Sequence, residues 1–244
     1  MITGYTINEN IKGLVENKRL AIVGPAKYLT STNFGSIINS YDIVVRVNNV
    51  IPFNYLKDYG SRTDIIYHCC NSKGIGAFEE QLNKDSIVTS NIKYVICPGT
   101  IIDSHNGISL TENFNKINTF NIPFHHVGKN NYTIVKRELN CEGNTGITGL
   151  LDILQYPIKE LLITGYSFYK EGNNIRDCYN SDYLKEYCPT KFNPANSHNI
   201  NRQLNYFKTT ILSKYYDIIT IDSYMNTVLS LKYNKHISYL CCKQ

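Results

Sequence analysis

The chain has 244 residues, of which 42% are hydrophobic and 18% charged, and its net charge is +5. This composition excludes a disordered chain and is sufficient for a sizeable core. Lysine and arginine are spread along the sequence, so the basic stripe typical of a nucleic-acid-binding protein is absent. No signal peptide and no apolar run of about 18 residues is visible. We therefore expect a single cytoplasmic domain covering residues 1–244.

The eight cysteines occur as pairs at 69–70 and 241–242 and singly at 97, 141, 178 and 188. No CxxC or other zinc-binding spacing is present. Several of the cysteines lie in apolar runs, where a reduced thiol behaves as a small hydrophobic group. DxD, HxH and HExxH are also absent, and the pair His125-His126 is expected in a loop or strand. We predict reduced thiols, no metal site and no cofactor.

Short apolar segments rich in β-branched residues recur along the chain and are typical of buried strands. Two stretches have helical spacing, 146–156 and 200–214. Strands alternating with helices predict an α/β fold with a mostly parallel, Rossmann-like sheet flanked by helices. Residues 103–131 and 171–197 are polar and poorly periodic, so we expect irregular lid or acceptor loops there. The predicted strands are 19–24, 41–49, 63–70, 92–99, 159–169 and 216–222.

Ligands of such folds bind beyond the carboxyl ends of the strands. "GPAKYL" at the first strand end has one of the three glycines of GxGxxG, which argues against a nicotinamide cofactor, and no Walker A sequence occurs. The strand ends offer as candidates Gly24-Pro25-Ala26, Arg46 with Asn48-Asn49, Pro98-Gly99-Thr100, and Gly165 to Tyr169.

A second candidate is the helix start in "CEGNTGITGLL", residues 141–151. Asn144 and Thr145 are favourable N-cap residues, and Gly146 allows close approach of a ligand to the backbone. Free N–H groups at a helix start bind anions. Two interpretations stay open, an anion site and a simple helix cap with tight packing.

The third candidate is His198, which directly precedes the predicted helix 200–214. The positive end of a helix macrodipole disfavours imidazolium, so the ring should be neutral near pH 7 and able to accept a proton. His198 is thus either a general base or a histidine that hydrogen-bonds a loop.

These segments, in this order, resemble the sialyltransferases of glycosyltransferase families 29 and 42. "LAIVGPAKYLTSTNFGSIINSYDIVVRVNN" is similar to the long sialylmotif of family 29, and "DYGSRTD" to the segment that follows it. "GNTGITGLLDILQYPIKELLITGYSFY" resembles the short sialylmotif, and its end is similar to the bacterial family-42 enzymes. "SHNINRQ" falls where both families have their catalytic histidine.

The resemblance implies a GT-A-variant fold and an inverting, metal-independent transferase that moves a sialic acid or related ulosonic acid from a CMP-sugar to a glycan acceptor. It makes His198 the general base and Tyr169 the hydrogen-bond donor to the leaving phosphate, with Tyr179 as a second tyrosine. The implied donor-binding residues are Gly24, Pro25, Ala26, Asn48, Asn144, Thr145, Gly146, Gly165, Tyr166, Ser167 and Phe168.

The chain departs from the family patterns at several positions. Pro25 replaces a frequent Asn or Ser, Ser167 replaces an aspartate, and Gln203 stands where His-x4-Glu has its glutamate. The cysteines that join the two sialylmotifs of secretory-pathway enzymes are replaced by Leu20 and Ile158, in agreement with a cytoplasmic protein.

Alternatives remain at this stage. One is a nucleotide-sugar-binding module without catalysis, and another is a different Rossmann-type nucleotide enzyme. The basic, aromatic stretch 231–244 is either a peripheral membrane contact or an ordinary surface helix or tail. The oligomeric state is open, a homo-oligomer included.

Overall fold

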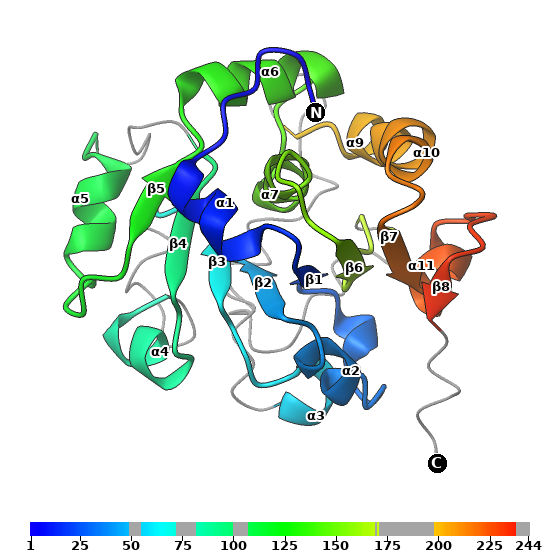
Figure 1. The fold of residues 1–244 in the computed structure, drawn as a ribbon, viewed down its shortest axis with the longest axis horizontal. Helices are drawn as coiled ribbons and strands as arrows, with labels where there is room; N and C mark the ends of the chain where they lie inside the picture. The colour runs from blue at the N-terminus through cyan, green and yellow to red at the C-terminus, as the bar shows by residue number, and fades with distance from the viewer. Residues whose placement is uncertain (49–54, 72–81, 100–106, 169, 171–197, 238–244) are drawn as a thin grey trace.

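The structure is a computed structural model that describes residues 1–48, 55–71, 82–99, 107–168, 170 and 198–237. Eight strands form one sheet in the order β5-β4-β3-β2-β1-β6-β7-β8, and every neighbouring pair is parallel (Figure 1). The strands are β1 (Arg19–Val23), β2 (Ile43–Val47), β3 (Ile65–Tyr67), β4 (Tyr94–Cys97), β5 (Phe124–His126), β6 (Glu160–Thr164), β7 (Ile219–Asp222) and β8 (His236–Ile237). The predicted α/β fold with a parallel sheet is confirmed.

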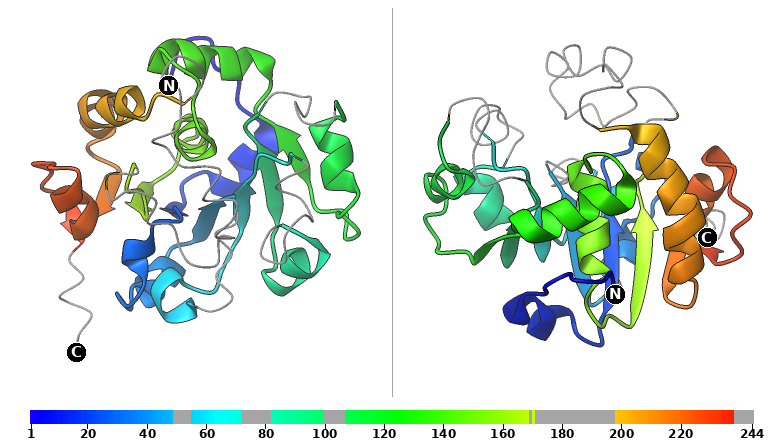
Figure 2. Two further views of the ribbon diagram at one scale, coloured as in Figure 1. Left: turned by 180° about the vertical axis from the view of Figure 1, so that it is seen from behind. Right: turned by 90° about the horizontal axis from the view of Figure 1, so that it is seen from above.

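Helices cover both faces of this sheet (Figures 1 and 2). One face packs against α1 (Glu9–Val15), α6 (Lys129–Leu139), α7 (Thr145–Ile153) and α9 (Ile200–Tyr206). The other packs against η1 (Lys27–Leu29), α2 (Gly35–Asn39) and α3 (Leu56–Tyr59) near β1 and β2, and against α5 (Leu110–Asn115) near β4. The remaining helices are α4 (Lys84–Thr89), η3 (Phe207–Ile211), α10 (Leu212–Lys214) and α11 (Ser223–Val228). Because both faces are covered, the central strands carry mostly apolar residues on both faces rather than an alternating pattern.

The predicted helix 200–214 is confirmed as the continuous run α9, η3 and α10, in which η3 is a π-helical turn. The side chains of Leu204, Phe207, Ile211 and Leu212 are buried, and Ile200 is partly buried against the same core. Their helical spacing therefore reflects one face packed on the sheet.

The expectation of an irregular segment at 103–131 is wrong for residues 107–131. This stretch contains α5, β5 and the first turn of α6. Ser109 caps α5 by accepting a hydrogen bond from the N–H of Thr111. The sequence signal was weak because β5 has three half-buried residues at the sheet edge and α5 has only six residues. Residues 103–106 and 171–197 lie outside the described residues.

The C-terminal stretch is also more regular than expected, since residues 236–237 form the short strand β8. The backbone N–H of Ile221 in β7 donates to the carbonyl of Lys235. Residues 238–244 lie outside the described residues, so the proposed membrane contact stays a prediction.

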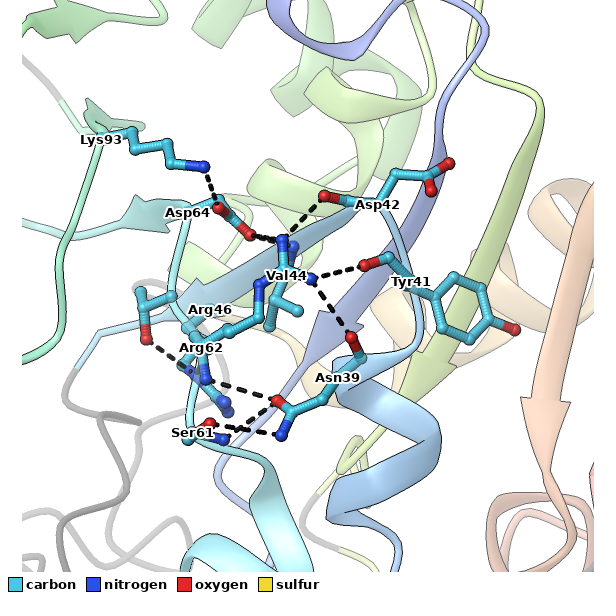
Figure 3. A network of polar contacts seen from close by, with 10 residues as sticks. Asn39, Tyr41, Asp42, Val44, Arg46, Ser61, Arg62, Asp64 and Lys93 are labelled. Atoms are coloured by element: carbon cyan, nitrogen blue, oxygen red, sulfur yellow. Dashed lines mark hydrogen bonds and ion pairs between the residues drawn. The ribbon is translucent and has the colours of Figure 1, made fainter.

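Arg46 is a structural residue rather than part of a ligand site, which corrects the sequence-based candidate (Figure 3). Its side chain is fully buried. Nε donates to the carbonyl of Arg62 and to the hydroxyl of Thr63, both at 3.0 Å. Nη2 donates to the carbonyls of Tyr59 at 2.7 Å and Gly60 at 3.2 Å. Arg46, which lies in the segment similar to the long sialylmotif, therefore fixes the backbone of the following motif, "DYGSRTD".

Asp64, the last residue of that motif, completes the network (Figure 3). Its buried carboxylate accepts from the backbone N–H of Val44 at 2.8 Å and from Arg62 Nη2 at 2.9 Å. Lys93 Nζ forms an ion pair with it at 2.7 Å. Because the carboxylate is paired on several sides, its burial is compensated. The network fixes β2 against β3 and so sets the middle of the sheet.

We predict that Arg46→Met lowers the free energy of unfolding by about 3 kcal/mol, because buried carbonyls would lose their donor. Urea unfolding followed by circular dichroism measures this change. Arg137→Met is the matched control, since Arg137 is exposed and pairs with Glu138 at 3.4 Å. An exposed pair contributes at most ~1 kcal/mol. Equal losses in the two variants would contradict the structural role of Arg46.

Candidate functional site

The order of the strands reverses between β1 and β6. From β1, the chain adds β2 to β5 on one side and β6 to β8 on the other. The carboxyl ends of strands at such a reversal are where ligands bind in open parallel sheets. Gly24 follows β1 directly and Gly165 follows β6 directly. The structure therefore brings two of the predicted donor-binding segments together at this point.

The two glycines cross in backbone-to-backbone contact. A Cβ atom on Gly24 would overlap the carbonyl oxygen of Gly165, and one on Gly165 would overlap the carbonyl oxygen of Gly24. Gly165 also has a φ of +76°, which favours glycine. Both glycines are therefore required by the crossing, whether or not they contact a ligand.

The turn after β1 has no free backbone N–H at residues 24 to 26. The N–H of Gly24 donates to the carbonyl of Thr164 at 2.8 Å, and that of Ala26 donates to the carbonyl of Gly165 at 3.0 Å. Pro25 between them has no N–H. This turn therefore cannot donate the backbone hydrogen bonds to a phosphate that a glycine-rich turn often provides.

The start of α7 does offer such donors. Asn144 is the N-cap, and its Oδ1 accepts from the N–H of Ile147 at 2.9 Å. Within the described part of the chain, the N–H groups of Thr145 and Gly146 have no hydrogen-bond partner. They carry the positive end of the dipole of this nine-residue helix. Of the two open interpretations, the structure shows the cap and also leaves two donors available to an anion.

The turn after β6 packs against this helix start. The hydroxyl of Tyr166 donates to the carbonyl of Gly146 at 3.3 Å. Burial raises the pKa of Tyr166, so its hydroxyl stays protonated. Phe168 is buried too, and its ring lies 5.1 Å from that of Phe207. Tyr166 and Phe168 thus pack the turn against α7 and η3. Ser167, between them, is more exposed.

His198 lies next to the same helix start. Its Nδ1 is 3.3 Å from the carbonyl oxygen of Glu142. A carbonyl only accepts, so this contact assigns the proton to Nδ1 and leaves Nε2 as the acceptor of the neutral ring. Burial lowers the pKa of His198, and the contacts with Glu142 partly oppose this. Burial therefore favours the neutral ring, in the same direction as the effect expected of the helix dipole.

Gln203 supports the same backbone carbonyl. Its side chain is fully buried, and Nε2 donates to the carbonyl of Glu142 at 3.0 Å. The ionised glutamate expected from the family pattern could not donate this hydrogen bond. Gln203 and His198 thus both hold the segment that leads into α7.

Asn48 lies at the end of β2 with a φ of +50°. Its N–H donates to the carbonyl of Tyr67 at 2.7 Å, and its Oδ1 accepts from the N–H of Cys69 at 3.3 Å. Asn48 therefore joins the ends of β2 and β3 at the same edge of the sheet as the site. Asn49, Thr100, Tyr169 and Tyr179 lie outside the described residues, so their predicted roles stay predictions.

Among the described residues, Cys69, Cys70, Cys97 and Cys141 form no disulfide with one another, and the reduced state of the thiols stays a prediction. Cys97 ends β4 opposite His126 of β5. A hydrogen bond with the thiol of Cys70, followed by contacts with His126, lowers the pKa of Cys97 to about 6, although burial opposes this. Among the described residues, no group of three or more metal-ligating side chains occurs. Nor does this part of the chain contain a helix long and apolar enough to span a membrane.

Sequence reasoning missed Tyr28 and Asp222. The hydroxyl of Tyr28 accepts from the N–H of Gly165 at 2.7 Å and donates to Asp222 Oδ2 at 2.5 Å. The signal available was Asp222 itself, a carboxylate at the end of an apolar strand directly before a helix. Tyr28 gave no signal, because one tyrosine among 20 is not distinctive.

The fold is similar to that of the sialyltransferases. Residues 9–131, about half of the chain, match the family described as "Glycosyltransferase family 29 (sialyltransferase)", and the chain belongs to this family. The predicted resemblance is confirmed.

The curated relatives match over a short region. The chain is 44% identical over 64 residues to the mouse CMP-N-acetylneuraminate-beta-galactosamide-alpha-2,3-sialyltransferase 4, and 39% identical over 62 residues to the human protein of that name. These matches cover 26% and 25% of this chain but only 19% and 18% of the relatives. The similarity thus spans about a fifth of the length of these relatives.

Solved structures resemble the whole fold. A mammalian sialyltransferase matches with a TM-score of 0.55 and 18% identity, over 90% of this chain and 74% of its own. The α-2,3-sialyltransferase Cst-I from Campylobacter jejuni matches with a TM-score of 0.57 and 18% identity, over 96% of this chain and 86% of its own. The architecture is therefore that of the sialyltransferases.

We predict that Gly24→Ala lowers the free energy of unfolding by at least about 2 kcal/mol, because the new methyl group meets backbone that has no room to move. The control is Gly13→Ala in α1, where a Cβ meets nothing within 4 Å. Alanine in place of an exposed helical glycine should stabilise by up to ~1 kcal/mol. Thermal unfolding of both variants measures the contrast, and a neutral Gly24→Ala would contradict the crossing.

We predict that His198 titrates below its usual pKa of 6.5 and is neutral at pH 7 with the proton on Nδ1. Because its pKa is lowered in the folded state, the unfolded state takes up the proton first, and stability falls as the pH falls below 6.5. Nitrogen-15 NMR of the ring measures the pKa and the tautomer. His198→Gln should flatten this part of the pH dependence, and a titration above 6.5 would contradict the burial argument.

Proposed function

We propose that this protein is an inverting, metal-independent glycosyltransferase that moves a sialic acid or related ulosonic acid from a CMP-sugar donor to a hydroxyl of a glycan acceptor. One observation carries the proposal. A neutral, partly buried histidine and a helix start with two available N–H donors are attached to the same short segment, Glu142 to Thr145, beside the Gly24–Gly165 crossing. Family membership and the CMP complex of a solved sialyltransferase with a similar fold support this assignment.

The free N–H groups of Thr145 and Gly146 would bind the donor's phosphate. Among the described residues these two N–H groups have no hydrogen-bond partner, whereas the turn after β1 has no available backbone N–H at residues 24 to 26. Aligned N–H groups at the positive end of a helix attract an anion without a cation. Gly24, Pro25, Ala26 and Asn48 would then face the nucleoside and sugar rather than donate to the phosphate.

His198 would act as the general base. Its Nε2 takes the proton from the acceptor hydroxyl, and the oxygen of that hydroxyl attacks the anomeric carbon of the donor. The bond between this carbon and the phosphate oxygen breaks, and CMP leaves with the electron pair. A single displacement of this kind inverts the anomeric configuration. A well-placed base contributes about 10²- to 10⁴-fold in rate.

The leaving phosphate gains charge as the bond breaks, and hydrogen-bond donors can stabilise that charge in place of a metal ion. Tyr169 and Tyr179 are proposed for this role from the family resemblance. The N–H groups at the start of α7 would add to it.

The proposal is tested by binding and transfer measurements on the same preparation. We expect CMP to raise the thermal stability of the parent protein, by about 2.7 kcal/mol at 100 times its Kd, whereas ADP and NAD should not. His198→Ala should reduce transfer from CMP-N-acetylneuraminate at least 100-fold while its CMP affinity stays within a factor of about three, because the base acts on the acceptor hydroxyl and Gln203 still donates to the Glu142 carbonyl in the variant.

His236→Ala is the control variant, since His236 lies on the short strand β8. EDTA should leave transfer unchanged. Absence of any response to cytidine nucleotides would overturn the proposed function. CMP binding without transfer to any acceptor on a glycan array would instead indicate the non-catalytic nucleotide-sugar-binding module.

A further inference from the structure

Gly165 needs outside support to keep its conformation. Its φ of +76° and lack of a side chain give it a wide choice of backbone angles. Its two backbone polar groups are both held by the region after β1. The carbonyl accepts from the N–H of Ala26 at 3.0 Å, and the N–H donates to the hydroxyl of Tyr28 at 2.7 Å. The two peptide groups that flank Gly165 are therefore each fixed by one hydrogen bond.

Tyr28 is itself held in place. Its hydroxyl donates to Asp222 Oδ2 at 2.5 Å, and its ring stacks on that of Tyr224, with centroids 3.9 Å apart and planes 15° apart. A hydroxyl that donates to a carboxylate has a fixed direction, so its lone pairs are presented to the N–H of Gly165.

Asp222 is the fixed end of this chain of hydrogen bonds. It is fully buried at the end of β7. Its Oδ1 caps α11 by accepting from the N–H of Met225 at 2.7 Å, and its Oδ2 also accepts from the hydroxyl of Thr164 at 2.8 Å. These bonds tie together the ends of β6 and β7 and the start of α11.

We propose that Tyr28 and Asp222 are positioning residues that fix the Gly165 turn in the orientation required to bind the donor nucleotide. This inference rests on the proposed function and extends it to two residues that do not themselves need to touch the donor. The pair holds the turn from the side of β7, and the start of α7 holds it from the other side through Tyr166 and Gly146. The residues that follow Gly165 are thereby placed between the two supports.

The test compares two tyrosines whose hydroxyls form hydrogen bonds at opposite ends of β6. Tyr28→Phe keeps the ring and the stacking on Tyr224 but removes the acceptor of the Gly165 N–H. Tyr41→Phe removes a similar bond, from the Tyr41 hydroxyl to Glu160 Oε1 at 2.9 Å, at the amino end of β6. Each variant loses one tyrosine–carboxylate bond, so a general loss of stability should affect both.

We expect Tyr28→Phe to bind CMP about tenfold more weakly by calorimetry and Tyr41→Phe to bind it as the parent does, because loss of one charge-assisted hydrogen bond corresponds to about that factor. Hydrogen exchange measured by NMR should show faster exchange of the Gly165 amide in Tyr28→Phe and not in Tyr41→Phe. In transfer assays the KM for the donor should rise more than kcat falls.

Asp222→Asn gives a second route to the same result. The asparagine oxygen can still cap α11, but its amide cannot accept from Tyr28. If the two residues act as one unit, the double variant with Tyr28→Phe should bind CMP no more weakly than the weaker single variant. Additive losses of CMP affinity in the double variant would show that Tyr28 and Asp222 act independently and would overturn the proposed chain of hydrogen bonds.

The outcomes separate the two claims. A parent protein that does not bind CMP overturns the proposed function, and the Gly165 amide then decides the role of Tyr28. Unchanged amide exchange in Tyr28→Phe overturns the positioning role in every case, whereas faster exchange in that variant alone, together with weaker CMP binding, supports it. Faster exchange with undiminished CMP affinity also overturns it, because the turn would then be held without consequence for the donor.

Discussion

The contact between Gly24 and Gly165 is the constraint on which the site depends. Each glycine occupies the space that a Cβ on the other would need, so β1 and β6 approach at their carboxyl ends without side chains between them. This closeness lets the N–H of Ala26 reach the carbonyl of Gly165 and brings Tyr28 to its N–H. The crossing also coincides with the reversal of strand order, where a parallel sheet opens to a ligand.

The position of α7 follows from a second close contact, in the middle of the helix. A Cβ on Gly149 would lie 2.7 Å from Cγ of Tyr67, so α7 packs directly on that ring. The Tyr67 and Tyr5 hydroxyls donate to the buried carboxyl of Asp152 at 2.5 and 2.6 Å. Asp152 therefore links α7 to β3 and to the N-terminal segment.

The same carboxyl makes stability depend on pH. Burial raises the pKa of Asp152 to about 6, although the hydrogen bonds from Tyr5 and Tyr67 oppose this. A folded-state pKa above the usual 3.8 means that the stabilising contribution is complete below that value and is lost as the pH rises through 6. The buried carboxylate thus costs stability near neutral pH, and its hydrogen bonds specify where α7 lies.

The sequence predicted the parts of the fold that have strong local patterns. The long apolar strands and the helix 200–214 could be located because burial on both faces or on one face leaves a clear periodicity. β5, β8 and α5 could not, because each is short and placed by its neighbours rather than by its own residues. Residue types alone identified Gly24, Gly165, Asn144 and His198 as candidates. They did not show whether each residue binds a ligand or stabilises the fold. Arg46 shows the difference, since its motif is distinctive and its role is internal.

The hydrogen bonds of the backbone N–H groups explain why Pro25 and Gln203, two departures from the family pattern, are compatible with the proposed CMP-sugar site. Pro25 removes one donor from the turn after β1, and Tyr28 occupies the N–H of Gly165. Among the described residues, the N–H groups of Thr145 and Gly146 at the start of α7 are then backbone donors that the proposed function can assign to an anion. The conformation of the segment from Glu142 to Asn144 then matters more, because this segment sets the direction of the N–H groups of Thr145 and Gly146. Gln203 in place of a glutamate fits this arrangement, because only a neutral amide can donate to the Glu142 carbonyl that His198 also contacts.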